Sequence, residues 1–325
     1  MAKNSANALQ TEASRQSREL QVAAKGRSLW RDAFQRLARN RAAVLSVVII
    51  ILTILAAIFA SQLAPYSYTK QDLLITNQSP TISHPMGTDA LGRDQLSRLL
   101  YGARISMSVA LITLTIVLII GVPVGMISGF YGGTLDLLLM RLIDVFYAIP
   151  YYVLLILLQT YFLARLPHAH SGFLAVLASL NRVSGGLVGV FIGLSLFGWL
   201  NLARLTRGQV LTTKELDYVL AARAIGVPNR RLMWHHLLPN VLAPIIIMAA
   251  LLVPGFIIAE AGLSFIGLGA QPPVPSWGIM LSDGVQSIES YPYLTIFPAL
   301  AIGITLLAFN FLGDGLRDAL DPFMR

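Results

Sequence analysis

The sequence contains no cysteine among its 325 residues, and only 12% of its residues are charged. Without cysteine there is no disulfide framework and no thiolate metal site. A soluble domain normally carries about a quarter charged residues, so this low share excludes an ordinary soluble globular protein. Because 55% of the residues are hydrophobic and the mean hydropathy is +0.68, we predict a polytopic membrane protein.

Long apolar runs supply the predicted membrane spans. A helix crosses the hydrocarbon with roughly 17–25 apolar residues, and six runs qualify: 44–64, 105–127, 145–163, 187–205, 241–263 and 293–312. These runs lack the alternation of a membrane barrel, so we expect an all-α fold with six transmembrane helices. The first run is longer than the 7–15-residue apolar core typical of a signal peptide, which indicates a retained anchor.

Basic residues gather before the first span and between the fourth and fifth spans. Both segments fall on one side of the membrane if six helices alternate. The positive-inside bias therefore places both termini and the 205–240 loop in the cytoplasm. Topology explains the net charge of +8, so nucleic-acid binding is not predicted.

These features divide the chain into consecutive segments. The membrane core, residues 105–313, includes the 205–240 loop. Within the N-terminal tail, a basic amphipathic helix over 29–40 is expected at the lipid surface. The segments are a cytoplasmic tail (1–43), the first span (44–64), an extracytoplasmic segment (65–104), the membrane core (105–313) and a cytoplasmic tail (314–325).

The extracytoplasmic segment reads as a turn followed by an amphipathic helix. Asp94 and Arg98 are four positions apart, which predicts an ion pair on one helix face. Capping and local packing form one interpretation of this segment. The other is that Asp89, Arg93 and Asp94 contact an extracytoplasmic partner.

The connection over 164–186 contains a short apolar run (173–180) that cannot span a membrane. We expect an outside loop with a surface or re-entrant helix. His168 and His170 have no nearby carboxylate, so they are interpreted as loop histidines, and no metal site is predicted.

The 205–240 loop contains the signals of two helices. Thr212 to Glu215 have the spacing of a capping box, which predicts a helix start near Thr213. Gly226 suits the left-handed residue that ends a helix, and Pro228 suits the first turn of the next. Pro239 is expected to interrupt that second helix.

The same loop offers a surface to another protein. Ala221 and Ala222 would permit close approach to the backbone, and Arg223, Arg230 and Arg231 supply charge nearby. A solvated loop with ordinary helix punctuation is the alternative.

Sequence motifs distinguish these alternatives. Ala221-Ala222-x-x-x-Gly226, then nine residues, then His236-x-Leu238-Pro239 resembles the "EAA" loop of permease subunits in binding-protein-dependent ABC importers. Leu220 stands at the family's glutamate position and His236 at its aliphatic position. Both departures are familiar in the peptide-permease branch of the family, the OppC/DppC type. The sequence also resembles this branch in three further segments, 86–94, 259–278 and 313–322.

The resemblance implies a type I ABC importer permease fold in the inner membrane of a prokaryote. It implies a heterodimer with a second permease, two cytosolic ATPases, and an extracytoplasmic binding protein that delivers short peptides. The ATPases would be contacted through Leu220, Ala221, Ala222, Arg223, Gly226, His236, Leu238 and Pro239. The sequence has no Gly-x-x-x-x-Gly-Lys-[Ser/Thr] phosphate loop, so ATP and magnesium are expected on the partners, with no catalytic residue or cofactor here.

Several polar groups fall within the predicted spans. Glu260 would line the translocation route or form hydrogen bonds at a subunit interface. Arg141 and Asp144 suit an i,i+3 pair, and Arg204 can extend towards the membrane surface. Glycines 121, 125 and 129 indicate close helix packing, and Pro150 indicates a kink.

Two alternatives stay open at this stage. The same architecture could import nickel chelates, oligosaccharides or opines. An ion-driven secondary transporter would need paired intramembrane carboxylates or broken inverted repeats, and neither is apparent.

Overall fold

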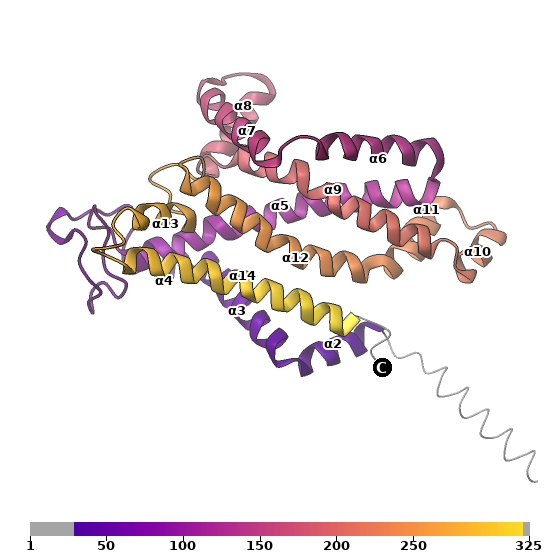
Figure 1. Ribbon diagram of the computed structural model, residues 1–325, viewed down its shortest axis with the longest axis horizontal. Coiled ribbons are helices and arrows are strands. Elements are labelled where there is room, and N and C mark those ends of the chain that lie inside the picture. Colours follow the sequence, from indigo (N-terminus) through magenta and orange to yellow (C-terminus); the bar gives the residue numbers. More distant parts are fainter. Residues whose placement is uncertain (1–28, 321–325) are drawn as a thin grey trace, which may run out of the picture.

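The computed structural model describes residues 29–320, which form a bundle of long helices (Figure 1). Within this range there is no strand, and Thr88 and Asp94 form an isolated antiparallel bridge. The first helix, α2 (Leu29–Arg39), occupies the place of the predicted amphipathic helix. The rest of the expected N-terminal tail, residues 1–28, lies outside the described part.

Five long apolar helices match five of the predicted spans. They are α3 (Arg41–Ile58), α5 (Gln95–Tyr131), α9 (Val188–Thr213), α12 (Leu238–Phe265) and α14 (Tyr293–Leu320). Most are longer than the apolar runs that predicted them. The expected boundary between positions 104 and 105 lies inside α5, and α14 continues through most of the expected C-terminal tail.

The predicted third span, 145–163, is not one straight helix. It is replaced by α6 (Gly133–Tyr147) and α7 (Tyr151–Arg165), whose axes differ by 81°. Pro150 is the N-cap of α7 and has an extended ψ of 112°. A proline lacks the amide hydrogen that would continue the helix and disfavours helical geometry in the preceding residue. By length and composition this pair qualifies as one broken span, which brings the candidate spans in the described residues from five to six.

The remaining short elements lie mainly beyond the ends of the spans. Five of them are α4 (Ala60–Leu63), η1 (Leu73–Ile75), η2 (Leu166–His168), α8 (Gly172–Val183) and α13 (Trp277–Val285). The short helix α8 confirms the apolar helix expected around 173–180.

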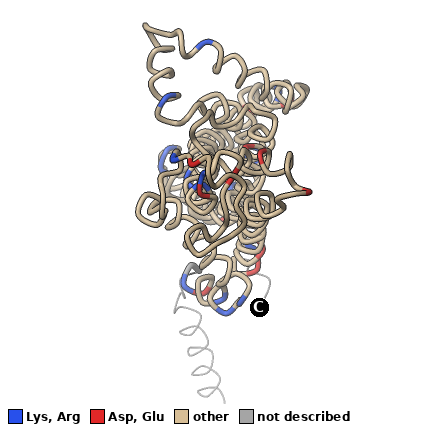
Figure 2. The backbone as a smooth tube through the Cα atoms, turned by 90° about the vertical axis from the view of Figure 1, so that its left-hand side faces the viewer, with Lys and Arg blue, Asp and Glu red and all other residues tan. Residues whose placement is uncertain are grey.

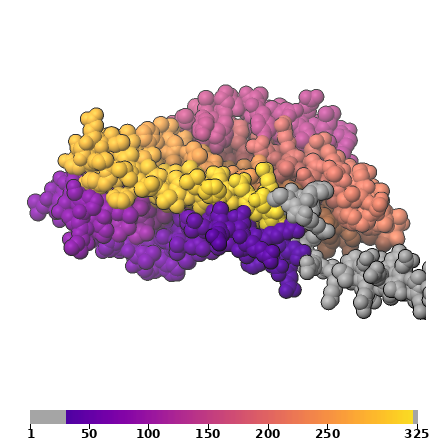
Figure 3. Space-filling view, turned by 60° about the horizontal axis from the view of Figure 1, so that its bottom comes forward, coloured from indigo at the N-terminus to yellow at the C-terminus, as the bar shows by residue number. Residues whose placement is uncertain are grey.

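The two ends of the bundle carry different segments. At one end lie α10 (Asp217–Ala224), the start of α2 and the end of α14, and we call this the α10 end (Figure 1). The 64–94 segment and α13 lie at the opposite end, the α13 end. Figure 3 shows α14 running along α2 and α3. The described part of the chain thus begins and ends on the side of the 205–240 loop, as the predicted topology requires.

The centre of the bundle is a close contact between α5 and α9. A Cβ added at Gly125 would lie 2.5 Å from the carbonyl oxygen of Ala203. Similar contacts recur one turn away on either side, at Gly121 and Gly129. Small residues at every fourth position allow two membrane helices to meet backbone to backbone, as the sequence predicted.

Candidate functional site

The first helix of the segment between α9 and α12 begins later than the predicted start near Thr213. α9 continues through Thr213, and α10 starts after Leu216, with no side-chain cap from the Thr212–Glu215 pattern. The predicted helix start at Thr213 is therefore wrong. Thr213 is buried in the last turn of α9, and Lys214 Nζ donates to the carbonyl of Gly129 on α5 at 2.9 Å. Packing against α5 extends the span beyond its local capping signal.

Gly226 ends α10 as predicted. Its φ is +82°, its amide donates to Arg223 O at 3.0 Å, and the amide of Val227 donates to Ala222 O at 3.1 Å. These two bonds define a Schellman motif, which requires a left-handed residue and so favours glycine. A Cβ built at Gly226 meets no atom within 4 Å, so the backbone angle alone explains the glycine.

The prediction that Pro239 interrupts the second helix is wrong. α11 (Asn229–Arg231), the π-helical segment η3 (Leu232–Leu237) and α12 follow one another without a gap. Pro239 removes one amide donor and crowds the preceding turn. The wider π-helical turn accommodates this, and Asn240 Nδ2 donates to His236 O at 2.6 Å. The loop's second helix and the fifth span form one helix, Asn229–Phe265.

The segment of residues 217–239, called the α10 segment below, has an inner and an outer face. Val219 and Ala222 are buried on α10, which packs against η3. On the outer face, Leu220 and Ala221 are exposed, and Ile225 is 82% exposed. The adjacent alanines therefore have different roles: Ala222 packs inward, whereas Ala221 is available to another protein.

Two contacts hold α10 in position. The Arg223 guanidinium lies 5.7 Å from the centre of the Phe130 ring on α5. Tyr218 Oη lies 3.5 Å from the carbonyl of His236, and partial burial raises the pKa of this tyrosine. The segment thus rests on α5 and on the beginning of the helix that contains α12.

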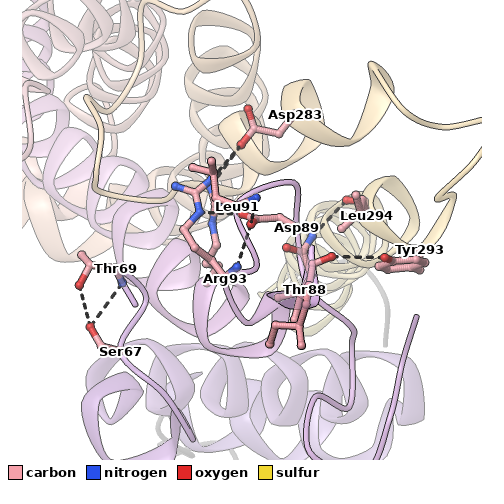
Figure 4. A network of polar contacts seen from close by, with 12 residues as sticks. Ser67, Thr69, Thr88, Asp89, Leu91, Arg93, Asp283, Tyr293 and Leu294 are labelled. Carbon is pink, nitrogen blue, oxygen red and sulfur yellow. Dashed lines mark hydrogen bonds and ion pairs between the residues drawn. The ribbon is translucent and has the colours of Figure 1, made fainter. Parts of the chain in front are cut away.

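An ion cluster organises the α13 end (Figure 4). Asp89 Oδ2 accepts from Arg93 Nε at 2.7 Å and from Arg98 Nη1, while Arg98 Nη2 lies 3.3 Å from Asp283 Oδ2 on α13. Asp89 and Arg98 are buried, and the cluster borders a pocket of ≈ 240 Å³. Figure 2, viewed onto this end, shows acidic and basic positions together near the centre.

The charge of Asp89 is stabilised by its neighbours. Burial by itself would raise the pKa of this carboxyl. The positive charge of Arg98, together with the hydrogen bonds and charge of Arg93, outweighs burial and lowers the pKa below 3.8.

The predicted pair between Asp94 and Arg98 does not form. Asp94 instead caps α5, accepting from the Ser97 amide at 2.8 Å and from Ser97 Oγ at 2.7 Å, and lies 2.8 Å from His84 Nδ1. Asp94 precedes the first helical turn, where capping competes with a side-chain pair. Within the chain, Asp89, Arg93 and Asp94 perform the capping and packing of the first alternative.

Glu260 is completely buried. Its carboxylate accepts hydrogen bonds from Ser106 Oγ on α5 at 2.9 Å and from Ser264 Oγ at 2.6 Å. Ser276, just before α13, lies 3.1 Å from Ser264 Oγ. Glu260 therefore joins α12 to α5 inside this chain.

Comparison with known proteins assigns the family. The family model of the binding-protein-dependent transport system inner membrane component matches residues 121–325, and the model of the N-terminal transmembrane domain of oligopeptide transport permease C matches residues 28–80. The chain belongs to this permease family. Its helical architecture is the type I importer permease fold, in a multi-pass protein of the bacterial inner membrane.

Similarity to curated members of the family extends over nearly the whole chain. An oligopeptide transport system permease protein OppC of Bacillus subtilis is 41% identical over 94% of this chain and 93% of its own length. OppC of Haemophilus influenzae is 42% identical (92% and 90% of the two chains). The dipeptide transport system permease protein DppC of Alkalihalophilus pseudofirmus is 40% identical (92% and 91%).

Contacts between α6 and α9 are the polar features that sequence reasoning missed. Arg207 binds Asp136 with two bonds, of 2.5 Å from Nε and 2.6 Å from Nη2. Asp144 lies 3.8 Å from Arg141, its predicted partner, but makes a closer contact with Arg204. The partners lie on different helices, 71 and 60 positions apart, so no local spacing could indicate them.

Proposed function

We propose that this permease is a membrane-spanning subunit of an ABC importer for short peptides. The observation that supports this most strongly is near-full-length similarity to curated permeases whose names specify oligopeptides or dipeptides. The match of residues 28–80 to an oligopeptide-permease N-terminal domain supports the same substrate class. A second, related permease, two cytosolic ATPases and an extracytoplasmic binding protein complete the importer.

The outer face of the α10 segment docks on an ATPase and so couples the permease to it. Leu220, Ala221 and Ile225 offer exposed apolar surface, and Arg223 adds charge beside it. Gly226 shapes the turn, while His236, Leu238 and Pro239 lie at the junction with α12 and transmit movement. ATP and magnesium bind to the partners, so nucleotide hydrolysis occurs there and this chain has no catalytic residue.

The α13 end faces the binding protein. The buried cluster around Asp89, Arg93 and Asp94 gives this surface its shape, whereas Asp283 keeps 49% of its side chain exposed. Direct contact with the binding protein is therefore assigned to exposed groups such as Asp283, with the buried charges as their support.

Reconstitution of the four kinds of subunit in liposomes tests this function. We expect ATP-dependent accumulation of dipeptides or oligopeptides when the binding protein is present. Uptake of nickel chelates, oligosaccharides or opines, with no uptake of any peptide, would contradict the peptide assignment. Peptide uptake driven by an ion gradient without ATP would contradict the importer class.

A matched pair of variants tests docking separately. Ile225→Asp places a charge on an 82% exposed residue at the end of α10, and Val183→Asp does the same to a 90% exposed residue at the end of α8, near the α13 end. Neither change disturbs a buried side chain, so both proteins should insert and fold. We expect Ile225→Asp to lower co-purification of the ATPases and peptide uptake, and Val183→Asp to retain the ATPases. Equal retention by both variants would exclude the docking surface.

A further inference from the structure

The break between α6 and α7 lies near the middle of the membrane. The ring of Phe197 on α9 is 6.3 Å from that of Phe146 before the break and 5.1 Å from that of Tyr151 after it. The next residue, Gly198, packs against Val117, which is central in the apolar run 105–127. The interrupted backbone is therefore at mid-depth rather than at a membrane surface.

The break is also open to its surroundings. Residues 148–150 are all exposed in the described chain. The amides of Ala148 and Ile149 are paired with the preceding turn, and Pro150 has no amide hydrogen. The first amides of α7 have no carbonyl in a preceding turn and no side-chain cap, and lipid cannot bond to them. Non-helical backbone at membrane depth is tolerated where it is covered by protein or lines a water-filled cavity. This face of the chain therefore does not face lipid.

Polar side chains continue from the break towards the α10 end. Tyr147 Oη donates to Asn201 Oδ1, and the Arg204 guanidinium lies 4.6 Å from the centre of the Tyr147 ring. Arg204 also pairs with Asp144, although 44% and 48% of these side chains are exposed. Exposed charges are costly against lipid, and inside a membrane they mark aqueous paths.

A second exposed face provides the contrast. α14 exposes an apolar stripe, and its exposed polar side chains begin only at Asn310, near the α10 end; the stripe consists of Ile296, Leu300, Ile304, Leu307 and Phe311. This is the composition expected of a surface in contact with lipid. α6 also exposes Leu137, Leu138 and Val145, so the polar groups of α6 and α9 form a narrow strip between apolar side chains.

The polar groups of α6 and α9 carry an excess of positive charge. Asp136 and Arg207 satisfy each other through two bonds. Asp144 accepts its closer contact from Arg204 and lies 3.8 Å from Arg141, which keeps 75% of its side chain exposed. Arg141 is thus the cation with the weakest internal partner here, and a guanidinium binds carboxylates well.

We propose that the polar strip, formed by Arg141, Asp144, Tyr147, Asn201 and Arg204 beside the break at 148–150, lines the aqueous route of the transported peptide. Arg141 attracts the peptide's C-terminal carboxylate. The substrate part of this inference rests on the proposed peptide function. The aqueous exposure of the strip does not depend on it.

The absence of cysteine from the chain makes a labelling test direct. Ala148→Cys and, as control, Leu300→Cys on the apolar stripe are each assembled with the partner subunits in liposomes. A charged, membrane-impermeant thiol reagent should modify Ala148→Cys in at least one nucleotide state and leave Leu300→Cys unmodified. Peptide supplied during ATP turnover should slow the modification several-fold. Asn201→Cys repeats the test on α9 if Ala148→Cys does not assemble.

Two results would overturn the proposal. If neither Ala148→Cys nor Asn201→Cys is modified in any nucleotide state, the strip is covered by the partner permease. If both are modified at a rate that peptide does not change, the strip is aqueous but lies off the route. Neither readout requires measurable uptake, so failure of the peptide function would be recognised separately, as an absence of peptide uptake by the unaltered importer.

The role of Arg141 has its own measurement. We expect Arg141→Gln to lower uptake of a peptide with a free C-terminus by about tenfold relative to its C-terminally amidated form, equivalent to about 1.4 kcal/mol. Arg141→Lys should restore most of the preference, because it keeps the charge. An equal loss for both peptides would exclude recognition of the carboxylate.

Discussion

Arg98 donates to the carboxylate of Asp89, nine positions earlier in the chain, and both side chains are buried. This contact fastens the turn before α5 onto α5 itself. Arg98 also reaches Asp283 on α13, 185 positions later. One guanidinium therefore links the extracytoplasmic segment to the last third of the chain.

Removal of that guanidinium should destabilise the protein. Arg98→Gln leaves Asp89 buried with Arg93 as its remaining cation, and breaking a buried pair costs about 3–5 kcal/mol. We expect a lower thermal unfolding midpoint in detergent. Arg141→Gln, at a 75% exposed side chain, is the control and should change the free energy of unfolding by less than about 0.5 kcal/mol. Equal midpoints for the two variants would show that the cluster contributes no stability.

The same cluster should respond to acid in a defined window. The pKa of Asp89 is below 3.8 in the folded protein, so its contribution to stability is complete above 3.8 and is lost as the pH falls through the folded pKa. The difference in unfolding midpoint between the unaltered protein and Asp89→Asn should stay constant from about pH 5 to 7 and shrink below about pH 3.8. A difference that shrinks already between pH 7 and 5 would contradict this assignment.

The contact between α5 and α9 predicts opposite outcomes for two glycines. Gly125→Ala places a methyl group 2.5 Å from Ala203 O, whereas Gly208→Ala on α9 meets nothing within 4 Å. We expect Gly125→Ala to separate the helices and destabilise the protein by about 1–3 kcal/mol. Gly208→Ala should be neutral or stabilise it by up to about 1 kcal/mol, because alanine favours a helix. Thermal unfolding of the two purified variants compares them, and loss of stability in both would argue against a specific contact at Gly125.

Glu260 should matter through its hydrogen bonds. Glu260→Ala leaves the hydroxyls of Ser106 and Ser264 without their acceptor and opens a cavity, so we expect a loss of about 3 kcal/mol. Glu260→Gln keeps the shape, and serine hydroxyls can both donate and accept, so its loss should be smaller. Thermal unfolding measures both variants. If the two variants are equally unstable, a role of the negative charge itself is indicated.

Much of the fold follows from the sequence because apolar length and glycine placement act locally. Apolar runs located the spans, and Gly226 marked the end of α10 because only its own backbone angle matters. The predicted helix start at Thr213 was wrong because packing against α5 extends α9 through that residue. The predicted interruption at Pro239 was wrong because a π-helical turn accommodates the proline. Pro150 was expected to kink a helix, and it lies instead at a complete break, where the axes of α6 and α7 differ by 81°.

Ionic partners were the least predictable features. Asp94 and Arg98 have ideal helical spacing, yet capping engages the first and Asp89 engages the second. Arg207 meets Asp136 only because α6 returns beside α9. Such pairs depend on the tertiary arrangement of the helices, which no spacing within one helix encodes.

The helix from Asn229 to Phe265 runs without a gap from the α10 segment through the fifth span. It begins beside the proposed ATPase-docking surface, and near its far end Glu260 is fastened to α5. At 1.5 Å per residue, about 45 Å of continuous helix separates these points. We therefore expect a displacement at the docking surface to be carried along one helix towards Glu260, with bending confined to Pro244 and Pro254.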